Sequence, residues 1–206
     1  MSWIQTISRP QAEGRLRQLY DRVAGPDGRV DNILKLHALR PHTLDGHMGL
    51  YKRVLHHPGN QLPKATLEMI GVYVSLLNGC DYCVEHHFVG LQRLIGDERR
   101  SSMVRTALEA AVGQEPEVDE ALSQADVAAL RYARELTLRP DQMTQSAVVR
   151  LRDAGYDDGR ILEINQVVAY FAYANRTVLG LGASIEGDEL GLSPGNAEDP
   201  DDWSHH

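Results

Sequence analysis

The stretch that decides the fold runs from residue 63 to residue 87 and reads PKATLEMIGVYVSLLNGCDYCVEHH. Its first part is a long apolar run that a proline opens and Asn78-Gly79 closes, which predicts a helix from Pro63 to Leu77. The residues after the glycine predict a second helix from Cys80 to about Ile95. This arrangement places a Cys-x-x-Cys pair at the N-terminus of the second helix.

Helical periodicity continues on both sides of this stretch, and no convincing alternation of period two appears. The sequence therefore predicts an all-α fold. The other predicted helices cover Pro10 to Val23, Val30 to Leu39, about His42 to His57, Glu98 to Val112, a segment that Ser123-Gln-Ala-Asp126 caps and that ends before Pro140, about Thr144 to Ala154, and Arg160 to Ala183.

The domain organisation follows from a change in composition near residue 187. Residues 1–186 are predicted to form one domain, because apolar helix-forming segments run through all of it. Residues 187–206 are acidic, contain Gly, Pro, Asn and Ser, and have little to bury. They predict a flexible tail, and its terminal histidine pair is left out of the search for metal ligands.

Two apolar helices open in a similar way, with Leu67-Glu68-Met69-Ile70 in one and Leu162-Glu163-Ile164-Asn165 in the other. Alignment of Glu68 with Glu163 places Asn175 opposite Cys80. This suggests an internal repeat with one functional and one structural copy, although two apolar helices can also match by chance.

Composition and charge exclude several classes of protein. The 206 residues carry a formal net charge of -8, and their basic residues form no stripe that could neutralise nucleic-acid phosphates. No apolar run approaches the roughly 18 residues that cross a bilayer, and the first residues lack the features of a signal peptide. The sequence therefore predicts a cytoplasmic protein without a nucleic-acid or membrane partner. In that compartment a Cys-x-x-Cys pair is more often catalytic or metal-binding than a structural disulfide.

The only two cysteines, Cys80 and Cys83, have a spacing that lets them close a disulfide without a large backbone movement. The helix N-terminus favours a thiolate there, and His87 lies one turn after Cys83, where it can take or return a proton. Glu68 lies on the preceding helix among apolar neighbours. If it faces inward, burial should raise its pKa and make it a proton carrier near neutral pH. These four residues are the predicted catalytic site.

Other interpretations of this segment exist. The cysteines could be plain core residues, and Glu68 could be a solvated helix residue. A zinc site could use Cys80, Cys83, His87 and either His86 or Glu68. However, structural zinc usually takes its second ligand pair from a distant segment, and no second Cys-x-x-Cys or His-x-x-x-His exists here. Neither a metal nor a cofactor is therefore predicted.

The remaining polar residues near the motif receive weaker predictions. Glu85 and His86 are expected to face solvent or a subunit contact, while Tyr82 shapes the pocket or donates a hydrogen bond. His47 or Tyr51 would line the approach to the cysteines only if their helix covers them. Packing or surface roles are predicted for most of the upstream histidines, which are His37, His42, His47, His56 and His57.

The motif Glu68-x11-Cys80-x2-Cys83-x3-His87 resembles the AhpD-like group of the carboxymuconolactone decarboxylase superfamily, and in particular its peroxidase-related branch. The residues Asn175-Arg176 and Leu181-Gly182 are also similar to the last helix of that branch. The resemblance covers roughly residues 10 to 185 and is most specific in the cysteine segment.

This resemblance implies an all-α fold with a helical repeat, assembled as a dimer, trimer or hexamer. It implies a disulfide-cycling hydroperoxidase in which Cys83 attacks the hydroperoxide and Cys80 resolves the sulfenic acid. His87 and Glu68 would move protons through water, and a thiol or dihydrolipoyl-type partner would reduce the disulfide. No haem, flavin or metal is implied.

The chain departs from the family at Tyr82, where some members carry a histidine between the cysteines. Other functions also remain open. The pair could serve a non-peroxidatic thiol-disulfide oxidoreductase or redox sensor, or it could clamp a zinc in a structural protein. The chain could also be a decarboxylase or isomerase of the superfamily with incidental cysteines, although decarboxylase members generally lack the pair.

Overall fold

The computed structural model describes residues 2–192, which contain helices and no β-strand, so the prediction of an all-α fold is confirmed. Its elements are the 3-10 helix η1 (Arg9–Gln11), α1 (Gly14–Val23), α2 (Asn32–Lys35), α3 (Pro41–Tyr51), the π-helical turn η2 (Lys52–His56), α4 (Lys64–Leu77), α5 (Asp81–Ile95), α6 (Glu98–Gly113), α7 (Gln124–Leu138), the 3-10 helix η3 (Pro140–Gln142), α8 (Gln145–Asp153) and α9 (Asp158–Leu181).

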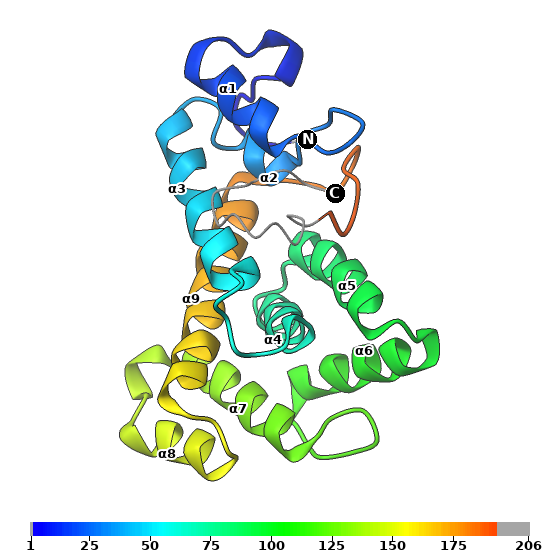
Figure 1. Cartoon of the computed structure of the whole chain (residues 1–206), viewed down its shortest axis with the longest axis vertical. Helices are drawn as coiled ribbons and strands as arrows, with labels where there is room; N and C mark the ends of the chain where they lie inside the picture. Colours follow the sequence, from blue (N-terminus) through cyan, green and yellow to red (C-terminus); the bar gives the residue numbers. More distant parts are fainter. Residues whose placement is uncertain (1, 193–206) are drawn as a thin grey trace.

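Helix α4 lies at the centre of the molecule, where α5, α6, α7 and α9 surround it (Figure 1). Every residue from Leu67 to Ser75 is buried. A helix buried on all sides must be apolar all round, which explains the unbroken apolar run of this segment. Helix α9 approaches α4 closely at Gly71, since a Cβ atom there would lie 2.2 Å from the Phe171 ring.

The predicted helices near the N-terminus are shorter in the structure. The segment from Pro10 to Val23 divides into η1 and α1, because Gly14 adopts a left-handed φ of +53° at the start of α1. The segment from Val30 to Leu39 holds only the single turn of α2, after which the chain bends before Pro41 begins α3. These corrections concern short segments whose structure depends on tertiary contacts more than on periodicity.

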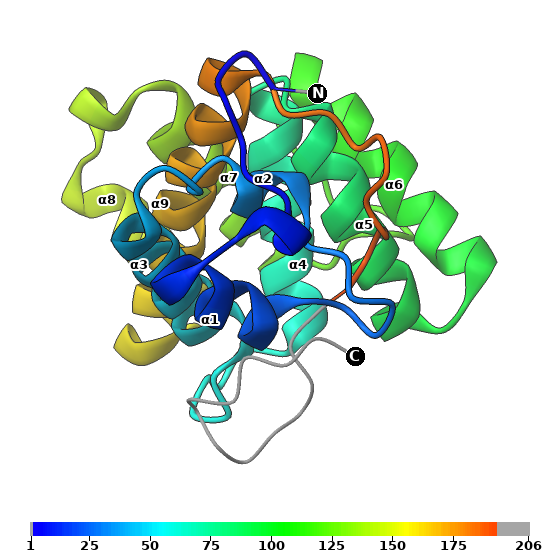
Figure 2. The same cartoon turned by 90° about the horizontal axis from the view of Figure 1, so that it is seen from above.

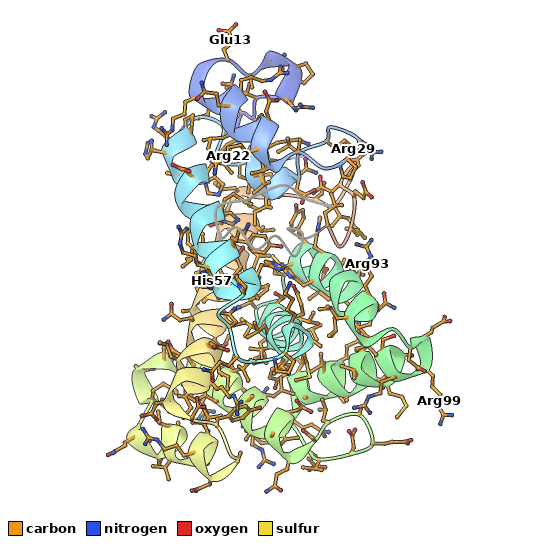
Figure 3. The ribbon with its side chains drawn as sticks, viewed as in Figure 1. Glu13, Arg22, Arg29, His57, Arg93 and Arg99 are labelled. Atoms are coloured by element: carbon orange, nitrogen blue, oxygen red, sulfur yellow. The ribbon has the colours of Figure 1, made fainter. Side chains whose placement is uncertain are left out.

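Helices α1 and α2 gather at one end of the molecule together with the last described residues (Figures 1 and 2). We call residues 184–192 the C-terminal strap. The Asn32 side chain donates to the carbonyl groups of Ser184 and Glu186 at 2.8 and 3.0 Å. Arg93, labelled in Figure 3, donates to the Gly191 carbonyl at 2.6 Å. The strap includes residues 187–192 of the predicted flexible tail. The rest of that predicted tail, residues 193–206, lies outside the described residues.

No helix in residues 2–192 has both the length and the apolar character that a membrane span requires.

Candidate active site

The turn between α4 and α5 sets the position of the cysteines. Gly79 adopts a left-handed φ of +66°, a conformation that glycine takes without the penalty of a side chain. The Cys80 backbone N–H then donates to the Ser75 carbonyl at 2.9 Å, and Cys80 becomes the N-cap residue of α5. The Cys-x-x-Cys pair therefore lies at the positive end of a helix dipole, as the sequence predicts.

The two thiols are free, buried and in contact with each other. The hydrogen bond from Cys83 lowers the pKa of Cys80, and the same contact, together with burial, raises the pKa of Cys83. Of the two sulfurs, Cys80 is therefore the one that ionises more readily, and its thiolate would be hydrogen-bonded to the Cys83 thiol. The amide of Asn175 also contacts both sulfurs and favours the anion.

Asn175 is fixed by two further hydrogen bonds in the core between α4 and α9. Its Nδ2 donates to Ser75 Oγ at 3.0 Å, and its Oδ1 accepts from Asn78 Nδ2 at 2.9 Å. Asn175 is fully buried. It is the residue that the alignment of the two apolar helices places opposite Cys80.

Glu68 and His87 form a buried pair between α4 and α5. His87 Nδ1 lies 2.7 Å from Glu68 Oε2, and Glu68 is only 5% exposed. Burial by itself raises the pKa of Glu68, but the charge and hydrogen bond of His87 outweigh it, so this pKa lies below its ordinary value. Glu68 faces inward, which was the condition for a raised pKa, but the predicted rise of its pKa is wrong. Glu68 is a carboxylate that orients and supports the imidazole of His87.

The pair and Cys83 line one cavity of about 60 Å³. Cys83 and His87 lie four residues apart on α5 and so share a helix face. Cys80 does not line the cavity. The other lining residues come from the segment before and within α2, from α3, α5 and α9, and from the strap; they are Asp31, Ile33, Leu34, His47, Met48, Tyr51, Tyr82, His86, Gly90, Tyr170, Ala174, Gly191 and Leu192. Of the two sulfurs, only that of Cys83 can meet a small molecule in this space.

Helix α3 forms one wall of this cavity. The sequence predicts that His47 or Tyr51 lines the approach to the cysteines if this helix covers them, and both residues do line the cavity. Tyr51 is buried and contacts Tyr170 with ring centroids 5.8 Å apart. His47 lies next to Tyr170 at 5.9 Å and is 4% exposed. Burial lowers the pKa of His47 to about 3, so its imidazole is neutral at physiological pH.

His86 does not lie where the sequence predicts, which is at the surface or at a subunit contact. His86 is buried and stacks on Tyr82 with centroids 4.5 Å apart, so it faces the cavity and not solvent. The Tyr82 hydroxyl donates to Asp188 Oδ2 at 2.6 Å and accepts from the Ile33 backbone N–H at 3.1 Å. The strap explains this correction, because Asp188 Oδ1 accepts from the Asn32 N–H at 3.0 Å while Asp188 Oδ2 lies 3.4 Å from His86 Nε2.

Comparison with known proteins agrees with this geometry. The sequence pattern of the carboxymuconolactone decarboxylase family matches residues 41–125, which include all four predicted catalytic residues. An uncharacterized peroxidase-related protein from Silicibacter sp. TM1040 is 26% identical, with a TM-score of 0.63 over 76% of this chain and 77% of that one. The chain is therefore similar to the peroxidase-related, AhpD-like proteins of the carboxymuconolactone decarboxylase superfamily.

Two further solved structures share the fold. The alkylhydroperoxidase AhpD core of an uncharacterized peroxidase-related protein from Ralstonia eutropha JMP134 is 21% identical, with a TM-score of 0.73 over 89% of this chain and 91% of that one. The debrominase Bmp8 in complex with 2,3,4-tribromopyrrole is 18% identical, with a TM-score of 0.66 over 91% and 95% of the two chains. No curated protein matches the sequence.

The four predicted site residues lie together, and two further groups join them that the sequence did not indicate. Asp31 lines the cavity, and burial raises its pKa to about 6. Asp188 contacts the Tyr82 hydroxyl from the strap. Neither belongs to a motif, since an aspartate in a polar segment gives no signal of burial. Within residues 2–192, no three His, Cys, Asp or Glu side chains are arranged to hold a metal ion.

Proposed function

We propose that this protein is a thiol-dependent hydroperoxidase, in which Cys83 attacks a small organic hydroperoxide and Cys80 completes a disulfide. The observation that carries the proposal is that Cys83 and the Glu68–His87 pair line one small cavity, while the partner sulfur of Cys80 lies behind it. A nucleophile, a proton carrier and a resolving thiol are the groups that two-electron peroxide reduction needs.

The first step begins when the Cys80 thiolate takes the proton of Cys83. The Cys83 sulfur then attacks the terminal oxygen of the hydroperoxide, so that a sulfur–oxygen bond forms and the oxygen–oxygen bond breaks. The departing alkoxide takes a proton from the imidazolium of His87. Because Nδ1 is held by Glu68, Nε2 is the nitrogen that exchanges this proton. The products are an alcohol and Cys83 sulfenic acid.

In the second step the Cys80 thiol returns a proton to His87, and the Cys80 sulfur attacks the Cys83 sulfur. The disulfide forms as the sulfur–oxygen bond breaks, and the leaving hydroxide takes the proton from His87 to become water. Two thiols and one hydroperoxide thus yield one disulfide, one alcohol and one water. Asn175, which contacts both sulfurs, supports the thiolate in each step.

Burial of both sulfurs favours this reaction over disulfide exchange with another folded protein. Cys80 is 0% and Cys83 is 3% exposed, so a bulky disulfide partner cannot reach either sulfur in this conformation. We propose that a slender reductant, a small thiol or a lipoyl-type arm, restores the dithiol through the same cavity. The reducing cytoplasm suits such a cycle. A dimeric, trimeric or hexameric assembly stays a prediction that light scattering would measure.

Single-turnover chemistry with two variants tests the roles. After one equivalent of tert-butyl hydroperoxide, Cys80→Ser should react more slowly than the wild type, because His87 must then take the Cys83 proton. It should accumulate a sulfenic acid on Cys83 that dimedone traps and mass spectrometry localises. Cys83→Ser should react slowly and give no such adduct. A sulfenic acid on Cys80 in the Cys83→Ser protein, formed at the wild-type rate, would reverse the roles. Retention of catalytic activity by the double variant would favour a superfamily reaction that does not use the thiols.

A further inference from the structure

Two imidazole nitrogens beside the cavity have no hydrogen-bond partner among the described residues. They are His47 Nδ1 and His86 Nε2, and both atoms are buried. Both side chains line the cavity, one from α3 and the other from α5. Buried polar atoms in proteins are nearly always paired, so two unpaired nitrogens beside one cavity mark a place where a polar group of a ligand belongs.

Both imidazoles are held in place by their surroundings and are separate from the proton carrier. His47 contacts the rings of His37, Tyr170 and Tyr173, with centroids 5.1 to 5.9 Å apart. His86 stacks on Tyr82, and its Nε2 lies 3.4 Å from Asp188 Oδ2 without forming a hydrogen bond. The steps proposed above use neither ring.

The charge of the cavity restricts what this polar group can be. Asp31 and Glu68 bring two carboxyl groups to its lining, whereas the described lining residues include no lysine or arginine. A carboxylate on a ligand would therefore lose its hydration and meet like charge, because the one cation of the proposed reaction, His87, is already paired with Glu68. The cavity favours a ligand without charge.

The size of the cavity also limits the ligand. Its volume of about 60 Å³ is several times the roughly 10–15 Å³ that a cavity needs to hold one water molecule. The cavity therefore suits a small molecule. Ile33, Leu34, Met48 and Ala174 give such a molecule an apolar surface to rest on.

We propose that His47 and His86 form a recognition subsite for an uncharged hydrogen-bonding group, a hydroxyl or a carbonyl, on a small neutral hydroperoxide. This inference rests on the proposed peroxidase function and names its substrate class. Cys83 and His87 act on the peroxide end of the molecule, and the two other imidazoles select the polar substituent. Hydroperoxides that carry a carboxylate are excluded.

Binding of stable product alcohols tests the subsite without any turnover. The three probes share one skeleton: tert-butanol, 2-methylpropane-1,2-diol and 2-hydroxy-2-methylpropanoate. They are titrated into reduced protein at pH 7.5, and the side-chain signals of labelled histidines are followed by NMR. The diol should bind about 3- to 10-fold more tightly than tert-butanol, the gain from one neutral hydrogen bond. It should shift the signals of His47 and His86, while the carboxylate should not bind.

Matched variants separate the subsite from the general fold. His47→Phe and His86→Phe should each reduce the advantage of the diol. His47→Asn and His86→Gln each keep a hydrogen-bonding atom near the lost nitrogen and should retain part of it. His42→Gln, an exposed change on the same helix as His47, should bind the three probes as the wild type does.

Three results would overturn the subsite: equal binding of tert-butanol and the diol, preferred binding of the carboxylate, or an advantage of the diol that survives both phenylalanine variants. Absence of binding by all three probes would overturn it as well. Because none of these measurements needs peroxide, a failure here is distinct from a failure of the proposed reaction. Conversely, if the protein binds the diol as expected but does not reduce tert-butyl hydroperoxide, the subsite is supported and the proposed peroxidase function is refuted.

Discussion

Replacement of Glu68 by glutamine removes the charge behind His87 while retaining an oxygen that can accept its hydrogen bond. In the wild type the carboxylate lies 2.7 Å from His87 Nδ1, and its side chain is 7% exposed. Solvent screening is therefore weak at this pair. A hydrogen bond to a charged group contributes about 1.5–3 kcal/mol, and a neutral one contributes about 0.5–1.5 kcal/mol.

The difference, about 1–1.5 kcal/mol, is the support that the imidazolium loses in the variant. At about 1.4 kcal/mol for each factor of ten, Glu68→Gln should reduce kcat/KM for tert-butyl hydroperoxide by about 5- to 12-fold. His87→Phe, which removes the proton carrier itself, should cost about 10²- to 10⁴-fold. The two losses should not add in the double variant, because Glu68 acts through His87.

The pH dependence gives this prediction a second readout. Because the folded-state pKa of Glu68 is depressed, its pair with His87 persists above the ordinary glutamate value of 4.5 and is lost only as the pH falls through the lower folded-state value. Wild-type stability should show this acid-side loss, and the Glu68→Gln protein should lack it. Thermal unfolding between pH 3 and pH 7 measures the difference.

Peroxide consumption in a coupled assay, with dithiothreitol as reductant, gives the rates. Glu85→Gln is the matched control, since Glu85 also lies beside a cation, Arg105, but at the outer face of α5 and away from the cavity. It should change kcat/KM by less than about twofold. If Glu68→Gln retained the full wild-type rate and the acid-side dependence of stability, the role assigned to this pair would be refuted.

Three further predictions concern the scaffold of the site. Gly71→Ala should lower the free energy of unfolding by about 1–3 kcal/mol in urea, because the new Cβ would lie 2.2 Å from the Phe171 ring. A smaller residue at position 171 should relieve part of this loss. Asp188→Asn should speed amide hydrogen exchange in residues 184–192, because the Asp188 carboxylate accepts from both the Tyr82 hydroxyl and the Asn32 N–H. Glu189→Gln, a change at an exposed neighbouring residue, should leave this exchange unchanged. Since burial lowers the pKa of His47 to about 3, this residue should cost stability as the pH falls below about 6.5, by about 1.4 kcal/mol per pH unit, and His47→Phe should remove that slope.

The long helices were predictable because each has a strong local signal. The segments that became α4, α5, α6 and α9 have unbroken periodicity and a clear proline, glycine or capping residue at their ends. The N-terminal region was predicted less well. Its helices are short, and contacts such as those of Asn32 with the strap decide their course more than their own sequence does.

The candidate site was predictable where its residues lie close together in the sequence. Cys80, Cys83 and His87 share one helix, and their spacing fixes which of them meet. The alignment of two apolar helices assigned Asn175 to the structural copy of the repeat, so it did not reveal that this residue contacts both sulfurs. Asp31 and Asp188 could not be found in this way, because their burial depends on how distant polar segments fold over α5. The pKa of Glu68 was misjudged because the gain from His87 exceeds the penalty of burial.

The measurement that tests the central claim most directly is a count of free thiols in the reduced wild-type protein before and after one equivalent of tert-butyl hydroperoxide. Two thiols should disappear together with the peroxide, and mass spectrometry should find one internal disulfide between Cys80 and Cys83. The account is contradicted if both thiols remain reduced after minutes of exposure, or if peroxide disappears while both thiols persist.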